Sequence, residues 1–112
     1  MVDKSLMAGS TGMLLLKLLE GEDLYGYQMI EELRRRSDHT FDLKAGTLYP
    51  LLHGLEEKGL VTAYEREAVA GKPRRYYHLT KAGSAALREK EESWNTYARA
   101  VGRVLKGGAC FG

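Results

Sequence analysis

The residue types that perform covalent or metal chemistry are few in this chain and lie far apart. Its three histidines, His39, His53 and His78, fall in different segments, and its single cysteine, Cys110, lies near the end. The ligand spacing of a metal site is absent, as are a glycine-rich phosphate loop and a paired nucleophile and base. The sequence therefore predicts no enzyme, no metal site and no bound cofactor.

Positive charge is instead concentrated in two short runs. Lys72, Arg74 and Arg75 lie within four positions beside a turn marked by glycine and proline. A basic turn can neutralise phosphates or enter a minor groove, although cations at a turn can also serve solubility alone. The other run, three arginines at 34–36, lies where a helix is expected to end, so stabilisation of the helix dipole competes there with DNA contact.

The first half of the chain reads as successive helices. Residues 13–19 are apolar nearly all round, which is typical of a helix packed on several sides, and Gly21 closes it. A second helix is expected to open at Asp23 or Leu24 and to run to Arg36.

A third helix follows a polar turn and a short extended link. Its apolar stripe recurs at helical spacing through Leu48, Leu51, Leu52 and Leu55. Gly59 supplies the stop, and Pro50 lies early enough in the helix to be tolerated.

The periodicity then changes to that of strands. Residues 61–67 and 74–79 are rich in β-branched and aromatic side chains and flank the basic turn, which predicts a β-hairpin. Tyr76 and Tyr77 point to opposite faces of the second strand, and the sequence leaves open which of them is buried. Thr80 is a suitable N-cap for a long helix that runs to about Lys106.

Three helices, a hairpin and a further helix form the order of a winged helix-turn-helix protein. The expected fold is mainly α (α+β), with a long C-terminal dimerisation helix. Residues 1–79 are expected to form the DNA-binding region, residues 80–106 the dimerisation helix and residues 107–112 a disordered tail.

Three motifs are individually weak but stronger in combination. They are Leu24-Tyr25-Gly26-Tyr27; Gly46-Thr47-Leu48-Tyr49-Pro50-Leu51-Leu52 with Leu55-Glu56 and Gly59-Leu60-Val61; and Gly71-Lys72-Pro73-Arg74-Arg75-Tyr76-Tyr77-His78-Leu79-Thr80 with Gly83. In this order they resemble the PadR family of transcriptional regulators over about residues 10 to 105. The resemblance implies a homodimeric repressor that binds a palindromic operator in double-stranded DNA and is released by a small molecule. The short chain resembles the subgroup that includes multidrug-responsive repressors, and the Gly-Thr-Leu-Tyr run disfavours a regulator of the MarR type.

Lys44 departs from the family pattern, in which a small polar residue commonly caps the third helix. A lysine at a helix start opposes the dipole unless a phosphate binds there, so Lys44 is a candidate DNA contact. Asp42 is the alternative cap.

The expected DNA contacts come from the start of the third helix and from the basic hairpin. They are Tyr25, Lys44, Ala45, Gly46, Thr47, Tyr49, Pro50, His53, Lys72, Arg74, Arg75 and Tyr76. Two alternatives stay open, because Tyr49 can pack against the hairpin and His53 can be a solvated surface residue. No arginine on the third helix is available to read guanine, so backbone contacts and DNA shape are expected to supply much of the affinity.

The last helix carries an apolar seam, because Leu87, Trp94 and Val101 recur every seven residues with Tyr97 and Val104 between them. Lys90 and Glu91 interrupt this seam. The residues expected at a dimer interface are Leu14, Leu15, Leu87, Trp94, Tyr97, Val101 and Val104. Trp94 and Tyr97 are also candidates for binding a planar aromatic effector, preferably a cation, with plain packing as the alternative.

Composition is compatible with this interpretation without proving it. The net charge of +2 is weak evidence for a nucleic-acid partner, and no apolar run reaches the length of about 18 residues that spans a membrane. The start of the chain reads as a helix and not as a signal peptide, and the lone Cys110 is expected to be a passive residue of a cytoplasmic protein. A winged-helix module for protein assembly, without DNA binding, is the rival function, and the cations beside the turn disfavour it.

Overall fold

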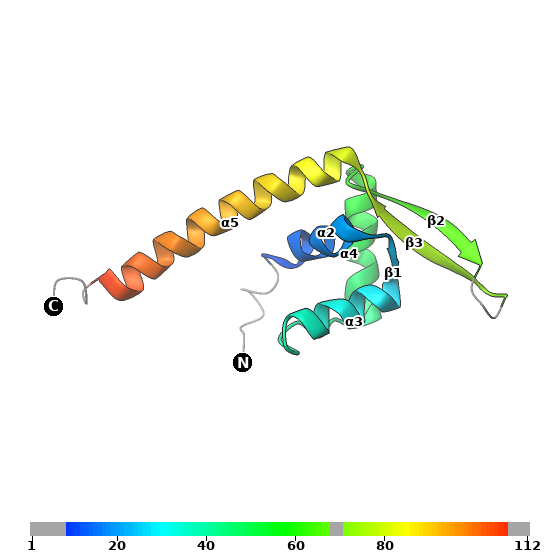
Figure 1. Cartoon of the computed structure of the whole chain (residues 1–112), viewed down its shortest axis with the longest axis horizontal. Coiled ribbons are helices and arrows are strands. Elements are labelled where there is room, and N and C mark those ends of the chain that lie inside the picture. The colour runs from blue at the N-terminus through cyan, green and yellow to red at the C-terminus, as the bar shows by residue number, and fades with distance from the viewer. Residues whose placement is uncertain (1–8, 68–70, 108–112) are drawn as a thin grey trace.

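The computed structural model describes residues 9–67 and 71–107. Within these ranges the four helices and the two hairpin strands follow one another in the predicted order, and a short strand before the second helix was not predicted (Figure 1). They are α2 (Thr11–Gly21), β1 (Leu24–Tyr25), α3 (Gly26–Arg36), α4 (Ala45–Glu57), β2 (Val61–Glu67), β3 (Pro73–Leu79) and α5 (Lys81–Gly107). The molecule is elongated, with extents of 64 × 29 × 21 Å, because α5 and the hairpin project in opposite directions from a helical body.

The helical body is held by leucines from every helix. α2 contributes Leu15, Leu16, Leu18 and Leu19, all buried, so the prediction of a helix packed on several sides is confirmed. α3 adds Met29 and Leu33, and α5 adds Leu87.

The apolar stripe of α4 is also confirmed. Leu48, Leu52 and Leu55 are buried, and Leu51 packs against the same core. The helix ends at Glu57, and Gly59 follows with a φ of +74°, a conformation that glycine adopts without steric cost.

A three-stranded antiparallel sheet of order β1-β3-β2 forms the wing. In its register Tyr64 lies opposite Tyr76 and Arg66 opposite Arg74, while Tyr25 on β1 pairs with Tyr76 from the other side. Successive strand residues alternate between faces, so these side chains share one face of the sheet. The other face of the sheet meets the core and carries Tyr77, which is buried, whereas Tyr76 on the first face is only partly buried. This settles the question that the sequence left open.

The second helix begins later than predicted. Leu24 and Tyr25 form the short strand β1, and α3 starts at Gly26. The backbone amide of Tyr25 donates to Gln28 Oε1 at 3.1 Å. Pairing with β3 thus keeps Leu24 and Tyr25 in a strand, although the helical pattern had included them in the second helix.

The start of α5 is fixed to the turn after α4. Thr80 is the predicted N-cap, because its Oγ1 accepts the amide of Gly83 at 2.9 Å and donates to the carbonyl of Gly59 at 2.7 Å. Gly83 packs directly on the carbonyl of Leu60, where a Cβ would collide with backbone. α5 then extends well past the body (Figure 1) and reaches Gly107, one residue into the predicted tail, whereas Cys110 lies outside the described residues.

Neither a membrane-spanning helix nor a cluster of metal ligands is found within residues 9–67 and 71–107. No helix there is long and apolar enough to cross a membrane. No group of three or more His, Cys, Asp or Glu side chains in the same ranges is placed to hold a metal ion.

Candidate nucleic-acid interface

The N-terminus of α4 presents free backbone donors to solvent. Lys44 precedes the helix in extended conformation, and its side chain makes no capping hydrogen bond. The Asp42 carboxylate lies 3.8 Å from Arg34 Nη1, and among the described residues no amide of α4 donates a hydrogen bond to it, so Asp42 does not cap the helix either. Within the described ranges no acceptor is found for the amides of Ala45 and Gly46, and both residues are exposed. Such amides at a helix N-terminus form a site for an anionic group.

The exposed side of α4 carries the side chains expected to reach bases. Thr47, Tyr49, Pro50 and His53 are exposed, opposite or beside the buried leucine stripe. Tyr49 and His53 lie one turn apart on one side of the helix. His53 Nε2 is 3.9 Å from a carboxylate oxygen of Glu57, and most of the His53 side chain is open to solvent.

Tyr49 packs against Gly26 at the start of α3. A Cβ placed on Gly26 would overlap the Tyr49 ring, so the glycine leaves the space in which this ring lies. Tyr49 remains 45% exposed. The hydroxyl end of Tyr49 therefore rests on Gly26, and nearly half of the residue stays open to solvent.

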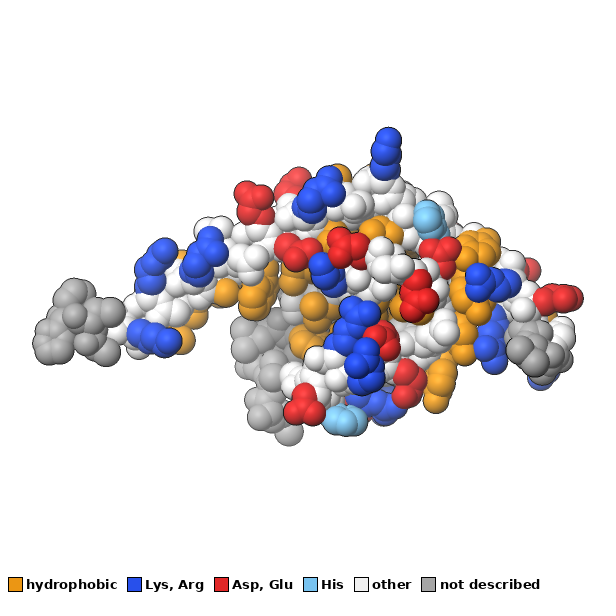
Figure 2. Space-filling model, viewed as in Figure 1, with side chains coloured by type: hydrophobic (Ala, Val, Ile, Leu, Met, Phe, Trp, Pro, Cys, Tyr) orange, Lys and Arg blue, Asp and Glu red, His pale blue; other side chains and the backbone are white. Residues whose placement is uncertain are grey.

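The outer face of the wing is lined by three tyrosines, Tyr25, Tyr64 and Tyr76, which we call the tyrosine face. The rings of Tyr64 and Tyr76 are stacked with centroids 5.8 Å apart, and Tyr25 meets Tyr76 edge to face at 5.4 Å. Figure 2 shows hydrophobic side chains and Lys or Arg side chains next to one another where the wing meets α3. Aromatic contacts of this kind restrict the rings and whatever packs on them.

Two arginines lie on the tyrosine face. The guanidinium of Arg74 lies 4.4 Å from the centroid of Tyr25 and donates to its hydroxyl at 2.8 Å. The guanidinium of Arg66, a residue not among the predicted DNA contacts, lies 4.2 Å from the centroid of Tyr76. Strand alternation predicts that the side chains of residues 61–67 are divided between two faces of the sheet. Only the observed register with β3 shows that Arg66 lies opposite Arg74.

The structure separates Arg75 from the other wing cations. It lies on the core-side face of β3, where Nη2 is 3.2 Å from the Glu56 carboxylate on α4 and the guanidinium approaches the Tyr77 ring. Arg75 therefore joins the wing to α4. Lys72 is exposed in the turn before β3.

The arginines at the end of α3 are engaged locally. Arg34 pairs with Glu31, while Arg35 and Arg36 lie 2.6 and 2.9 Å from Glu32. Hydrogen bonds from Arg35 and Arg36 hold the pKa of Glu32 below its usual value. These ion pairs favour the local role for this arginine run over DNA contact.

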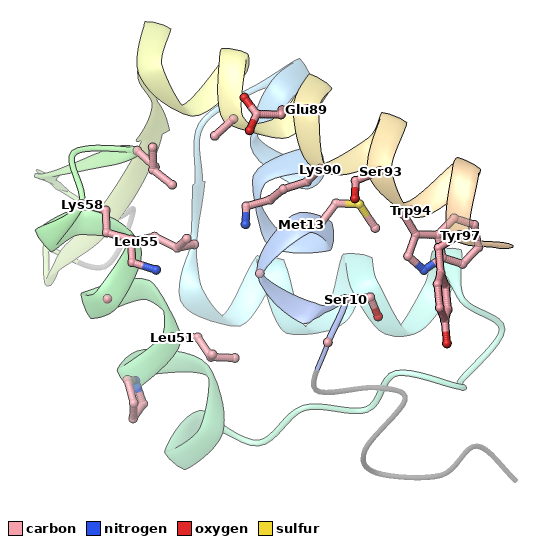
Figure 3. Close-up of a pocket in the computed structure, with 16 residues that line it drawn as sticks. Ser10, Met13, Leu51, Leu55, Lys58, Glu89, Lys90, Ser93, Trp94 and Tyr97 are labelled. Carbon is pink, nitrogen blue, oxygen red and sulfur yellow. The ribbon is translucent and has the colours of Figure 1, made fainter. Parts of the chain in front are cut away.

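An open groove of about 900 Å³ runs behind α4, between the start of α2 and the middle of α5 (Figure 3). Met13, Leu51 and Leu55 form its apolar side, and Trp94 and Tyr97 lie at its end on α5. Lys58 and Lys90 project into the space between α4 and α5, and Glu89 lies at the edge. Among the described residues, no carboxylate forms an ion pair with either lysine.

Two residues expected at the dimer interface are in the core. Leu15 and Leu87 are 0% exposed within a single chain, so they leave no surface for a partner, and their assignment is wrong. Heptad spacing cannot distinguish a residue that packs inside its own chain from one that packs on a second copy. Leu14 and Val101 are half-buried, whereas Trp94, Tyr97 and Val104 are exposed, as is Leu105, which the seam had not included.

The chain is similar to transcriptional regulators over most of its length. A regulator of Mycobacterium tuberculosis, Rv3488, is 40% identical over 79 residues, which are 70% of each chain. A PadR family regulator from Eggerthella lenta superimposes with a TM-score of 0.79 at 37% identity, covering 91% of this chain and 87% of that one. A transcriptional regulator from Clostridium thermocellum gives a TM-score of 0.82 at 27% identity, with 89% and 97% covered. The model of the transcriptional regulator PadR-like family matches residues 15–89. The chain therefore belongs to the PadR-like family of transcriptional regulators.

Proposed function

We propose that the protein is a homodimeric transcriptional repressor that places α4 of each protomer in the major groove of a palindromic operator. The observation that carries this proposal is that α4 and the wing are joined by contacts at Tyr25 and Gly26. Tyr49 of α4 rests on Gly26, the neighbouring Tyr25 accepts a hydrogen bond from Arg74, and both Tyr49 and Arg74 are exposed. A recognition helix beside a cationic wing suits a groove and its flanking phosphates.

Within this interface, backbone contacts supply most of the affinity. The amides of Ala45 and Gly46 with Lys44 bind one phosphate, and Lys72, Arg66 and Arg74 bind others along the wing. Thr47, Tyr49 and His53 are the candidates for base contact. None of these matches the guanidinium geometry that reads guanine, so DNA shape contributes to operator choice.

In this proposal residues 1–79 form the DNA-binding region and residues 80–106 the dimerisation helix. The dimer contacts lie on the outer half of this helix. Trp94, Tyr97, Val104 and Leu105 expose apolar area that the chain's own core does not cover. A two-fold axis along this helix would set the spacing of the two α4 helices and hence of the half-sites.

The decisive experiment is a titration of fluorescent duplexes at several salt concentrations. Binding to a random duplex should weaken steeply as salt rises, and a palindromic operator selected from a random pool should bind more tightly. Light scattering should give twice the chain mass. Absence of binding to any duplex at low salt would overturn the proposed DNA binding and favour the rival reading, a protein-assembly module.

We further propose that a planar aromatic molecule binds at Trp94 and Tyr97 and weakens operator binding. A ligand in the groove would lie between α5 and the back of α4, so it could shift the recognition helix directly. The groove contains Lys58 and Lys90 but only one carboxylate, Glu89, so a planar anion should be preferred over the planar cation expected from the aromatic pair alone.

Paired dyes of similar shape and opposite charge test this second part. Trp94 is the single tryptophan, so quenching of its fluorescence reports occupancy directly. The anionic dye should quench more strongly and release operator DNA over the same concentration range. Quenching without release of DNA would mean that the groove binds dyes but does not control operator binding. If neither dye quenches the fluorescence, Trp94 serves only in packing.

A further inference from the structure

The tyrosine face is tied to the body of the molecule by one carboxylate, that of Asp23. This residue lies in the link between α2 and β1. Its Oδ2 accepts a hydrogen bond of 2.6 Å from the Tyr64 hydroxyl on β2, and its Oδ1 lies 2.8 Å from His78 Nδ1 on β3. A single side chain thus holds both strands of the projecting hairpin from a point outside them.

The tie continues through the rings to the arginines. Tyr64 stacks on Tyr76, Tyr76 meets Tyr25, and the guanidinium groups of Arg66 and Arg74 lie over Tyr76 and Tyr25 respectively. Every link in this chain is a direct contact. The position of the two cations is therefore coupled to that of the Asp23 carboxylate.

Arg66 and Arg74 occupy directly opposed positions in the β2–β3 register. Like charges at such positions repel each other, and the pair is stabilised when an anion lies between them. In the part of the chain that the structure describes, neither arginine forms an ion pair with a carboxylate. The Asp23 carboxylate attracts Arg66, which helps to lower the pKa of Asp23. A phosphate from outside the protein would offset the repulsion between the two arginines.

We propose that Asp23 is a positioning residue for DNA binding, which holds Arg66 and Arg74 side by side, through Tyr64 and the stacked rings, as a clamp for the phosphate backbone. This proposal rests on the proposed DNA-binding function. Asp23 also lies two residues before Tyr25, and Tyr25 adjoins the glycine on which Tyr49 rests. The same short segment therefore sets the wing and touches the recognition helix, so it fixes the distance between the two sets of DNA contacts.

Long-range electrostatics and the clamp predict opposite effects when Asp23 is neutralised. A negative charge near bound phosphates repels them, so its removal alone should strengthen binding. If Asp23 positions the arginines, its removal should weaken binding. A matched control is Glu65→Gln, which removes one negative charge from the same strand as Tyr64 but on the opposite face.

The test measures affinity for a random duplex as a function of salt for Asp23→Asn, Tyr64→Phe and Glu65→Gln. Tyr64→Phe keeps the ring and removes only the hydroxyl that donates a hydrogen bond to Asp23. We expect the first two changes to weaken binding roughly 5- to 10-fold and to reduce the salt slope by about one unit or more, because at least one phosphate contact becomes poorly placed. Glu65→Gln should leave the affinity unchanged or raise it.

Two further readouts separate positioning from a general loss of fold. In the wild-type protein, the Arg66 and Arg74 side-chain Nε–Hε signals should carry ring-current shifts in NMR spectra, and these shifts should shrink in Asp23→Asn while backbone signals of α2 and α4 stay in place. Adding Arg66→Ala and Arg74→Ala to Asp23→Asn should weaken binding less than it does in the wild-type background.

The outcomes distinguish the two proposals. If the wild-type protein binds DNA but Asp23→Asn and Tyr64→Phe bind as tightly or more tightly, the clamp is wrong and the proposed function stands. Unchanged arginine signals in Asp23→Asn would overturn the clamp on their own. If the wild-type protein binds no duplex, the proposed function fails together with the clamp.

Discussion

At the scale of single residues, the contacts that shape the wing join positions far apart in the chain, as between Asp23 and both Tyr64 and His78. Thr80 could be predicted as a cap because its role depends on residues three positions away. Arg66 and Asp23 could not be found in this way, because their contacts join β2 or the α2–β1 link to strands far along the chain. Arg75 seemed equivalent to Arg74 in the sequence, and the strand alternation sends them to opposite faces.

Gly26→Ala tests the contact that holds Tyr49. The new Cβ would collide with the far end of the Tyr49 ring, and this half-exposed side chain can rotate away from it. We expect the free energy of unfolding to change by less than about 1 kcal/mol, since the helix gains an alanine as it loses the contact. Operator preference over a random duplex should fall, measured as the ratio of the two dissociation constants.

The control for this change is Gly21→Ala, at the end of α2, where a Cβ meets nothing within 4 Å. It should leave operator preference unaltered. Equal preference in the wild-type protein and Gly26→Ala would mean that the position of Tyr49 does not contribute to base selection.

The ionisation of Asp23 predicts a pH dependence of stability. Partial burial raises the pKa of this carboxyl, but hydrogen bonds from Tyr64 and His78 outweigh burial and hold the pKa below its ordinary value. A carboxyl whose pKa is lowered in the folded state stabilises the fold at pH values above its pKa in the unfolded chain, about 4. It loses this contribution as the pH falls through its pKa in the folded state. The unfolding free energy of wild type minus that of Asp23→Asn should therefore be positive at neutral pH and shrink below about pH 4. Chemical denaturation of both proteins across that range measures it, and a difference that stays constant with pH would contradict the assignment.

At the scale of elements, periodicity located each helix and both hairpin strands, with errors at the ends. The start of α3 was placed too early because Leu24 and Tyr25 fit a helical pattern equally well, and pairing with β3 decided otherwise. The junction between the wing and α5 depends on the close approach of the Gly83 and Leu60 backbones, which hydrophobic periodicity does not predict. There Gly83 lies against the carbonyl of Leu60, and Thr80 bonds to the same turn.

Gly83→Ala should disturb this junction strongly. The added Cβ would meet the backbone carbonyl of Leu60 and the side chain of Leu79, and the backbone cannot move aside as a side chain can. We expect a loss of about 1 to 3 kcal/mol in the free energy of unfolding, as for overpacking of a core. Gly102→Ala on the same helix is the control, because open space surrounds it and alanine should stabilise the helix by up to about 1 kcal/mol. Denaturation of the three proteins at equal concentration gives the comparison, and equal stability of Gly83→Ala and wild type would contradict the packing at this glycine.

At the scale of the whole molecule, the fold follows from the sequence, whereas the division between core and interface does not. Leu87 belongs to the same heptad series as Trp94 and Val101, but α2 and the helical body cover it within one chain. Only the outer part of α5 extends past that body (Figure 1), so the exposed apolar surface proposed for a partner begins farther along the helix than the seam suggested.

The dimer is therefore expected to depend on the end of α5. Val104 and Leu105 are each 80% exposed, so replacing both by glutamate should leave the monomer folded while placing charge in the proposed seam. We expect light scattering at micromolar concentration to give the monomer mass, with the circular dichroism of a folded chain. Binding to a palindromic operator should weaken by a factor on the order of 10² or more, since two linked half-site contacts become independent. Arg103→Glu, which changes charge on the opposite side of the same helix, should leave the dimer intact. A double variant that still gives twice the chain mass would place the interface elsewhere, and the groove lined by Met13, Leu51 and Leu55 would be the next surface to test.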